Sequence, residues 1–117
     1  MTKKYQNLGV RPTGSMGEYA TLMLLPFARL CRKKSHDIRA NKTYIEVKAA
    51  RARKANADWT FNLKTAQKRW SPVFAFVCFS NGDSFKIERF YLVRKEAVLG
   101  KKSVYIKNKE FENFRVY

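Results

Sequence analysis

The segment VFAFVCF, residues 73–79, constrains the fold of this chain more than any other stretch of its sequence. All seven residues are apolar and three of them are Phe, so neither face of the segment suits contact with water. A strand of this composition belongs in the interior of a sheet, with a neighbour on each edge and packing on both faces. We therefore expect the fold to be organised around this strand.

The segments on either side supply candidate partners for the central strand. Residues 85–93, FKIERFYLV, follow a turn of typical composition at 80–84 and are expected to return as a partner strand. Three shorter elements are predicted as well: a strand over 58–63 (DWTFNL), a short basic helix or turn over 64–70 and one helical turn over 94–99. Residues 102–108, KSVYIKN, are predicted to add an edge strand.

A helix is predicted over residues 15–34, where apolar side chains recur near helical period and the end is basic. Ser15 and Glu18 have the spacing of a capping box at its start. Pro26 lies inside this segment, and because proline removes a hydrogen bond and clashes one turn back, a kink or break is expected there. Residues 1–14 are expected to form a flexible basic arm, and residues 15–117 a single domain.

A β-hairpin is predicted between the helix and the third strand. In residues 43–50, TYIEVKAA, apolar and polar side chains alternate, which is the period of a strand. If Asn41 and Lys42 form a two-residue turn, residues whose numbers have the same sum face each other, and Asp37 stands opposite Glu46. The side chain of Lys48 then lies on the same face as that of Glu46.

The predicted order of elements is helix, three strands, short helix, two strands. It indicates an α/β (α+β) fold in which a mixed β-sheet is flanked by helices. A length of 117 residues with 45% hydrophobic residues is enough for one core. Cys31 and Cys78 each lie in an apolar run without ligand spacing, so both are expected to be reduced core residues, neither disulfide-bonded nor bound to zinc.

The charge of the chain limits the choice of partner. A formal net charge of +16, from 25 Lys and Arg against nine Asp and Glu, favours a polyanion, with nucleic acid the commonest. Solubility alone requires far less charge. Gln67 with Lys64 and Lys68 is a candidate phosphate clamp, and the candidate DNA-contacting residues together are Arg39, Lys42, Arg51, Arg53, Lys54, Lys64, Gln67, Lys68 and Arg69.

The two opposed carboxylates are unusual in a chain that otherwise avoids acids. Opposed Cβ atoms in an antiparallel pair lie about 4.5–5.5 Å apart, so Asp37 and Glu46 repel unless a cation lies between them. With Glu18 they form the oxygen-donor set that Mg²⁺ or Mn²⁺ prefers, and Lys48 could hold or polarise an attacking water. These are the parts of a phosphodiester hydrolase.

A structural interpretation of the same residues stands beside the catalytic one. About one Glu/Asp-x-Lys triplet is expected by chance in a chain of this composition, so the triplet carries no weight outside the hairpin. Glu46 and Lys48 would then lie on a solvated strand face with Arg39 as a cross-strand partner, and Glu18 would be only a helix cap. Trp59 and Trp70 belong to the core or its rim more often than to a base-stacking surface.

The segments GSMGEYATLMLL, HDIRANKTYIEVKAA, DWTFNL, VFAFVCF and RFYLV occur in an order that resembles the PD-(D/E)XK nuclease superfamily. Its small Holliday-junction-resolvase-like and group I intron homing-endonuclease-like branches are the most similar. The resemblance spans about residues 14–99 and implies an α-β-β-β-α-β core. It also implies that Glu18 is the helix acid, Asp37 the hairpin acid, and Glu46 with Lys48 the E-x-K pair. His36 stands where the motif has proline.

The leading hypothesis is a metal-dependent DNA endonuclease that uses Mg²⁺ or Mn²⁺, possibilities including a Holliday junction resolvase and a homing or structure-specific enzyme. The alternatives are a non-catalytic nucleic-acid-binding module and a protein-interaction domain. A chain this small offers little surface to grip a duplex, so a homodimer is expected. The sequence contains no secretory signal and no long apolar run, so an intracellular protein without membrane insertion is expected.

Overall fold

The computed structural model describes residues 12–33, 36–53, 57–63, 71–82 and 84–117. For six of them it describes the backbone alone: Pro12, Thr13, Arg32, Lys33, His36 and Asp37. The regular elements of the described chain are α2 (Pro12–Leu24), β1 (Ala28–Lys33), β2 (His36–Ala40), β3 (Thr43–Arg51), β4 (Trp59–Asn62), β5 (Val73–Phe79), β6 (Ile87–Arg94) and β7 (Ser103–Ile106). Two 3₁₀ turns, η1 (Lys95–Ala97) and η2 (Glu112–Phe114), complete them.

A five-stranded mixed sheet forms the centre of the molecule, in the order β1-β2-β3-β5-β6. β3 and β5 run parallel, and the other neighbouring pairs are antiparallel. β5 lies between β3 and β6, and Phe74 through Phe79 are all buried. This confirms the interior position predicted for VFAFVCF, and the fold is of the predicted mixed α+β class.

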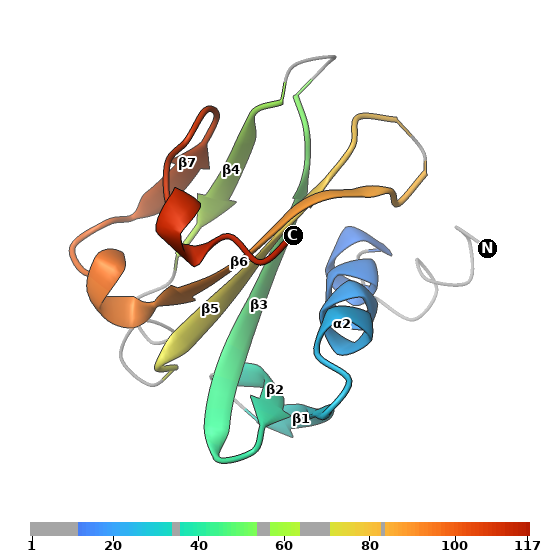
Figure 1. The fold of residues 1–117 in the computed structure, drawn as a ribbon, viewed down its shortest axis with the longest axis vertical. Helices are drawn as coiled ribbons and strands as arrows, with labels where there is room; N and C mark the ends of the chain where they lie inside the picture. The colour runs from blue at the N-terminus through green and yellow to red at the C-terminus, as the bar shows by residue number, and fades with distance from the viewer. Residues whose placement is uncertain (1–11, 34–35, 54–56, 64–70, 83) are drawn as a thin grey trace.

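The two faces of this sheet are covered by different elements. α2 packs on one face, where Ala20, Ile38, Val47 and Phe90 belong to one apolar cluster. β4 and β7 form a separate two-stranded sheet on the other face, as Figure 1 shows. The strand predicted over 58–63 is present as β4, but it pairs with β7 and not with the main sheet. The aromatic rings of β4 pack onto β5 instead, with the Phe61 and Phe76 centroids 4.8 Å apart.

The first helix is shorter than predicted at one end and longer at the other. It begins at Pro12, inside the segment expected to be a flexible arm, because proline suits the first turn of a helix. Ser15 therefore lies within the helix and cannot cap it, so the capping-box prediction is wrong. The helix ends at Leu24, and the break expected at Pro26 is confirmed. Residues Ala28–Lys33, predicted as the last helical turns, form β1.

Gly17 sets how closely α2 approaches the sheet. A Cβ atom at this position would lie 2.6 Å from the Cβ of Ala49 on β3, a distance that real contacts do not reach. Thr21, one turn later, is fully buried and donates its hydroxyl hydrogen to the Gly17 carbonyl oxygen at 2.8 Å. Because Gly17 has no side chain and the Thr21 hydroxyl is hydrogen-bonded within the helix, α2 can lie directly on β3.

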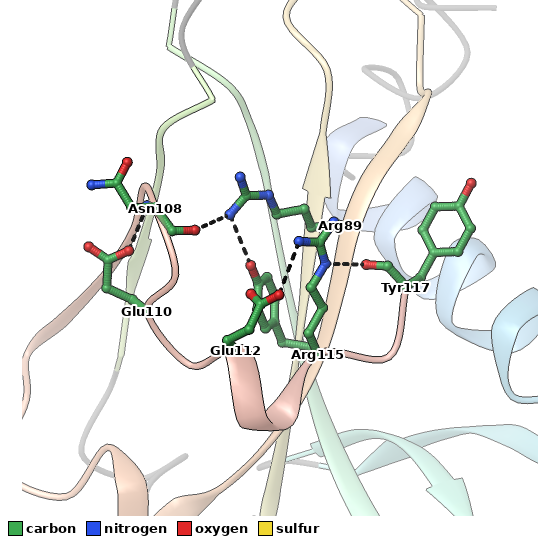
Figure 2. Close-up of polar contacts among 7 residues, drawn as sticks. Arg89, Asn108, Glu110, Glu112, Arg115 and Tyr117 are labelled. Carbon is green, nitrogen blue, oxygen red and sulfur yellow. Dashed lines mark hydrogen bonds and ion pairs between the residues drawn. The ribbon is translucent and has the colours of Figure 1, made fainter.

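The outer edge of β6 is covered by the C-terminal segment of the chain. The amide of Val116 donates to the Phe90 carbonyl oxygen at 2.7 Å. Figure 2 shows Arg89 donating to the Asn108 carbonyl oxygen, at 2.7 Å. Arg89 also donates to the hydroxyl of Tyr91 on its own strand, at 3.2 Å. The opposite edge of the sheet is β1, and no described strand pairs beyond it.

The remaining predictions on secondary structure have mixed outcomes. The helical turn expected over 94–99 is present as η1, and the strand expected over 102–108 is present as β7, paired with β4. The helix or turn predicted over 64–70 lies outside the described residues. Within the described chain, no helix is long and apolar enough to cross a membrane.

Candidate functional site

The hairpin that carries the candidate acids has the predicted register. Ile38 pairs with Ile45, and Ala40 pairs with Thr43, so Asn41 and Lys42 form the two-residue turn. Asn41 has a φ of 56°, a left-handed conformation that asparagine adopts more readily than most residues. Continuing this register by one residue sets the backbone of Asp37 opposite Glu46. The side chain of Asp37 lies outside the described part of the structure.

Glu46 and Lys48 lie on the face of β3 that turns away from α2. Their intervening neighbour Val47 belongs to the cluster beneath α2, and successive side chains of a strand point to opposite faces. In the parallel register Glu46 is level with Phe74 and Lys48 with Phe76, on the face that β4 and β7 cover farther along. The pair therefore lies at the border of a second apolar cluster, which lies between the two sheets and includes Trp59, Phe61, Phe74 and Phe76.

Glu46 is a carboxylate in an unusually dry position. It is only 5% exposed, and its Oε2 atom lies 4.0 Å from the Nζ atom of Lys48. Burial of a carboxylate is costly unless a positive group or hydrogen-bond donors accompany it. The neighbouring ammonium group meets part of that need, and the two side chains together form a polarised pair that reaches the surface through Lys48.

Glu18 comes from the other side of the sheet. It follows Gly17, whose backbone lies against Val47 and Ala49, and its own side chain is half-buried. Glu18 therefore lies on the α2 side of the sheet, and the side chain of Glu46 is on the opposite face. Because Ser15 is not a cap, the interpretation of Glu18 as the partner in a capping box is excluded.

Among the side chains that the structure describes, no three His, Cys, Asp or Glu residues gather as a group that could hold a metal. His36 and Asp37 are not among those side chains. The donors that the structure does describe near the hairpin are carboxylate oxygens, which suit hard divalent cations.

The candidate DNA-contacting residues divide into exposed and engaged side chains. Arg39, Lys42 and Arg53 are exposed on the hairpin and after β3. Arg51 is instead engaged with the β5–β6 connection, where it donates to the Gly82 carbonyl oxygen and its guanidinium lies 4.4 Å from the centroid of the Phe85 ring. The others lie outside the described residues: Lys54, Lys64, Gln67, Lys68 and Arg69.

Trp59 and Cys78 have the core positions that the sequence favoured, whereas Cys31 is only half-buried. Trp59 is fully buried and donates its indole N–H to the Phe79 carbonyl oxygen at 2.8 Å. Cys31 and Cys78 are both free, and Cys78 is buried. Burial raises the pKa of the Cys78 thiol well above its ordinary range, so this group is neutral and unreactive. Trp70 lies outside the described residues.

Sequence reasoning missed two residues beside the turn of the β2–β3 hairpin, Phe27 and Arg29. They line a cavity with Arg39 and Asn41. Both fall in the segment predicted to be helical, which obscured their relation to the hairpin. The break expected at Pro26 is the signal that could have revealed a new strand after it.

Comparison with known proteins identifies the fold. No family model matches the sequence, and no curated protein is significantly similar to it. Among solved structures, the chain is similar to a bacterial homing endonuclease, I-Ssp6803I, with a TM-score of 0.59 and 12% sequence identity. The match covers 88% of this chain and 83% of the homing endonuclease chain. The similarity therefore extends over almost the whole of both folds.

Proposed function

We propose that this protein is a metal-dependent DNA endonuclease that hydrolyses phosphodiester bonds at the β2–β3 hairpin. The observation that carries the proposal is the Glu46–Lys48 pair: a 5% exposed carboxylate with an ammonium group 4.0 Å away. It stands on a hairpin whose register leads to a second acid, Asp37. The same overall fold occurs in a bacterial homing endonuclease, which supports the choice of reaction class.

A binding surface for DNA gains nothing from such an acid pair. Two carboxylates close together in a protein of net charge +16 repel each other and repel the phosphates that the rest of the surface attracts. Burial of Glu46 adds a desolvation cost. An arrangement with these costs is expected where the acids perform a reaction.

The donor set fits Mg²⁺ or Mn²⁺, because hard carboxylate oxygens from adjacent strands are what these ions prefer. Asp37 and Glu46 would hold the ion, whereas Glu18 lies on the α2 side of the sheet, opposite the face of Glu46. A divalent ion supplies Lewis-acid stabilisation of the phosphate and a water that loses its proton near neutral pH.

Lys48 contributes a charge that the acids cannot. Its side chain is 19% exposed, and its Nζ atom lies 4.0 Å from the Oε2 atom of Glu46. In this position it would orient the attacking water and offset the negative charge that develops on the scissile phosphate. The surrounding basic surface would hold the DNA backbone and bring it to the hairpin.

The proposal extends to the substrate class within DNA. We propose a structure-specific or site-specific duplex cutter, of the Holliday-junction-resolvase or homing-endonuclease kind, acting as a homodimer. Two copies would place one hairpin on each strand of the duplex, since one small domain has a single acid pair for two strands.

The test is cleavage of labelled four-way junction, duplex and single-stranded DNA, with Mg²⁺, with Mn²⁺ and with chelator. The wild type is expected to cut only with metal. Asp37→Ala, Glu46→Gln and Lys48→Ala are expected to lower the cleavage rate at least a hundredfold, since each removes a group needed in the transition state. Binding in chelator should persist, and should strengthen slightly for the two acid variants because repulsion of phosphate is relieved.

Glu88→Gln is the matched control, because Glu88 is an exposed carboxylate on β6 and its loss changes the net charge equally. It should cut at the wild-type rate. Cleavage by Glu46→Gln at the wild-type rate would show that the site is misplaced. A wild type that binds DNA yet cuts none of the substrates with either metal would favour a non-catalytic binding module.

A further inference from the structure

A cavity of about 300 Å³ opens at the end of the hairpin, away from the second sheet. Phe27, Arg29, Arg39 and Asn41 line it. Arg29 comes from β1 and Arg39 from β2. Phe27 directly precedes β1, and Asn41 belongs to the turn between β2 and β3. The cavity thus combines two cations, an aromatic ring and an amide in one place.

The two arginines share a sheet face with the candidate active site. Arg29 pairs with Arg39, and Arg39 pairs with Tyr44, so these three side chains form a row across β1, β2 and β3. Tyr44 and Glu46 are two residues apart on β3 and so point to the same face. The row therefore lies about 6.6 Å from the row that contains Glu46. This spacing is comparable with the distance between successive phosphates of a nucleic-acid strand.

The position of Arg39 is fixed by the hairpin itself. Its Nε–H donates to the Asn41 carbonyl oxygen at 2.7 Å, and its guanidinium lies 5.8 Å from the centroid of the Tyr44 ring. In the described part of the chain, neither Arg29 nor Arg39 takes part in an ion pair. Two adjacent guanidinium groups repel each other, and an anion between them would remove that repulsion and bond both forks.

Phe27 adds an apolar surface beside the arginines. Its side chain is 60% exposed, and it lines the same cavity as Arg29 and Arg39. A flat ring next to a phosphate-binding pair is the combination by which proteins hold an unstacked nucleotide, with the base on the ring and the phosphate on the cations.

We propose that this cavity binds one nucleotide of the DNA strand adjacent to the scissile phosphate. Arg29 and Arg39 bind its phosphate, Phe27 stacks on its base, and Asn41 offers its amide to the base edge. The proposal rests on the proposed nuclease function for the identity of the nucleic acid, but the binding it describes does not depend on cleavage.

The phosphate part is tested by fluorescence anisotropy with labelled duplex and single-stranded oligonucleotides in chelator, over a series of salt concentrations. Arg29→Ala/Arg39→Ala should lower affinity at least tenfold and reduce the slope of log K against log salt by about 0.7 to 0.9, the value for one phosphate contact. Lys107→Ala/Lys109→Ala is the matched control. It removes the same charge from two exposed lysines in the loop after β7, at the opposite end of the molecule from the hairpin turn in Figure 1.

The base part is tested with Phe27→Ala and Phe27→Trp on the same probes. Phe27→Ala should weaken binding of the single-stranded oligonucleotide about tenfold, the lower range for loss of one stacked base, and Phe27→Trp should restore it. Equal unfolding midpoints for all variants would show that the changes arise at the cavity. Equal affinity of Phe27→Ala and wild type for both probes would overturn the stacking role.

The outcomes separate this inference from the proposed function. If the wild type cuts DNA and the arginine variant binds as the lysine control does, the cavity proposal is wrong and the nuclease proposal stands. If the arginine variant loses binding while the wild type cuts nothing with either metal, the cavity proposal stands and the nuclease proposal is wrong.

Discussion

Among the described residues, the β5–β6 half of the main sheet is packed on both faces, whereas the β1–β2 half is packed on one. On the face away from α2, Phe74, Phe76 and Tyr91 are fully buried beneath β4 and β7. On the same face of the other half, Arg29 and Arg39 are exposed. The edges differ as well, because the C-terminal segment covers β6, while no described strand pairs with the outer edge of β1.

This difference separates stability from recognition within one sheet. The β5–β6 half, which we call the closed half, supplies apolar burial, which is the main favourable contribution to folding. The open half is free to carry charge, and β3 connects the two, with Ala50 in the closed half and Glu46 at its border. A reacting group at such a border is held rigidly by the core and still reaches solvent, which is the position a preorganised site needs.

The largest loss of stability is expected from a truncation in the core that covers the β5–β6 half, the closed half. Trp59→Ala should lower the free energy of unfolding by about 3–5 kcal/mol, because it leaves a large cavity and removes the indole N–H bond to Phe79. Urea denaturation followed by circular dichroism measures this change.

Phe27→Ala provides the same kind of truncation in the open half. Since the Phe27 ring is largely exposed, its loss should change the free energy of unfolding by no more than about 0.5 kcal/mol. Equal losses in the two variants would contradict the division of the sheet into a closed and an open half.

An intermediate effect is expected at Gly17, where α2 meets β3. Gly17→Ala places a Cβ atom 2.6 Å from the Cβ of Ala49, so the helix must move outward. Overpacking of this kind costs about 1–3 kcal/mol. Urea denaturation measures the cost.

Gly14→Ala is the control on the same helix. A Cβ atom there meets nothing within 4 Å, so the free energy of unfolding should stay the same or rise by a few tenths of a kcal/mol through helix propensity. A Gly17→Ala protein as stable as this control would show that the close approach is not required.

The central strand and the hairpin could be predicted from sequence because their signals are local. VFAFVCF is apolar on both faces, and the register of the hairpin follows from a two-residue turn at Asn41 once period two is recognised. The start of the helix and the identity of β1 could not be predicted from the same rules. Ala28–Lys33 carries the basic residues that also suit a helix end, and tertiary pairing with β2 decided the outcome.

The site could be predicted only in part, for a related physical reason. Glu46 and Lys48 share a face by strand alternation alone, so their proximity follows from sequence. The pairing of β4 with β7, which fixes where the covered face ends, depends on contacts between segments more than 40 positions apart. The cavity at Phe27 and Arg29 likewise depends on the pairing of β1 with β2. Neither this cavity nor the limit of the face covered by β4 and β7 could therefore be predicted from the sequence.

The smallest expected effect distinguishes the two cysteines by pH. Burial raises the pKa of Cys78 above its ordinary value of 9.0, although Arg89 and Arg115 oppose the shift. The unfolded chain therefore loses this proton first, and stability that is fully present below pH 9 is lost as the pH rises. At pH 10 the loss attributable to this thiol should be about 1 kcal/mol. Urea denaturation at pH 8, 9 and 10 should show it in the wild type and in Cys31→Ala, a change in the open half, and should show a shallower loss in Cys78→Ala. Equal pH dependence in all three proteins would mean that the thiol of Cys78 is hydrated in the native state, and the closed half would then not be dry.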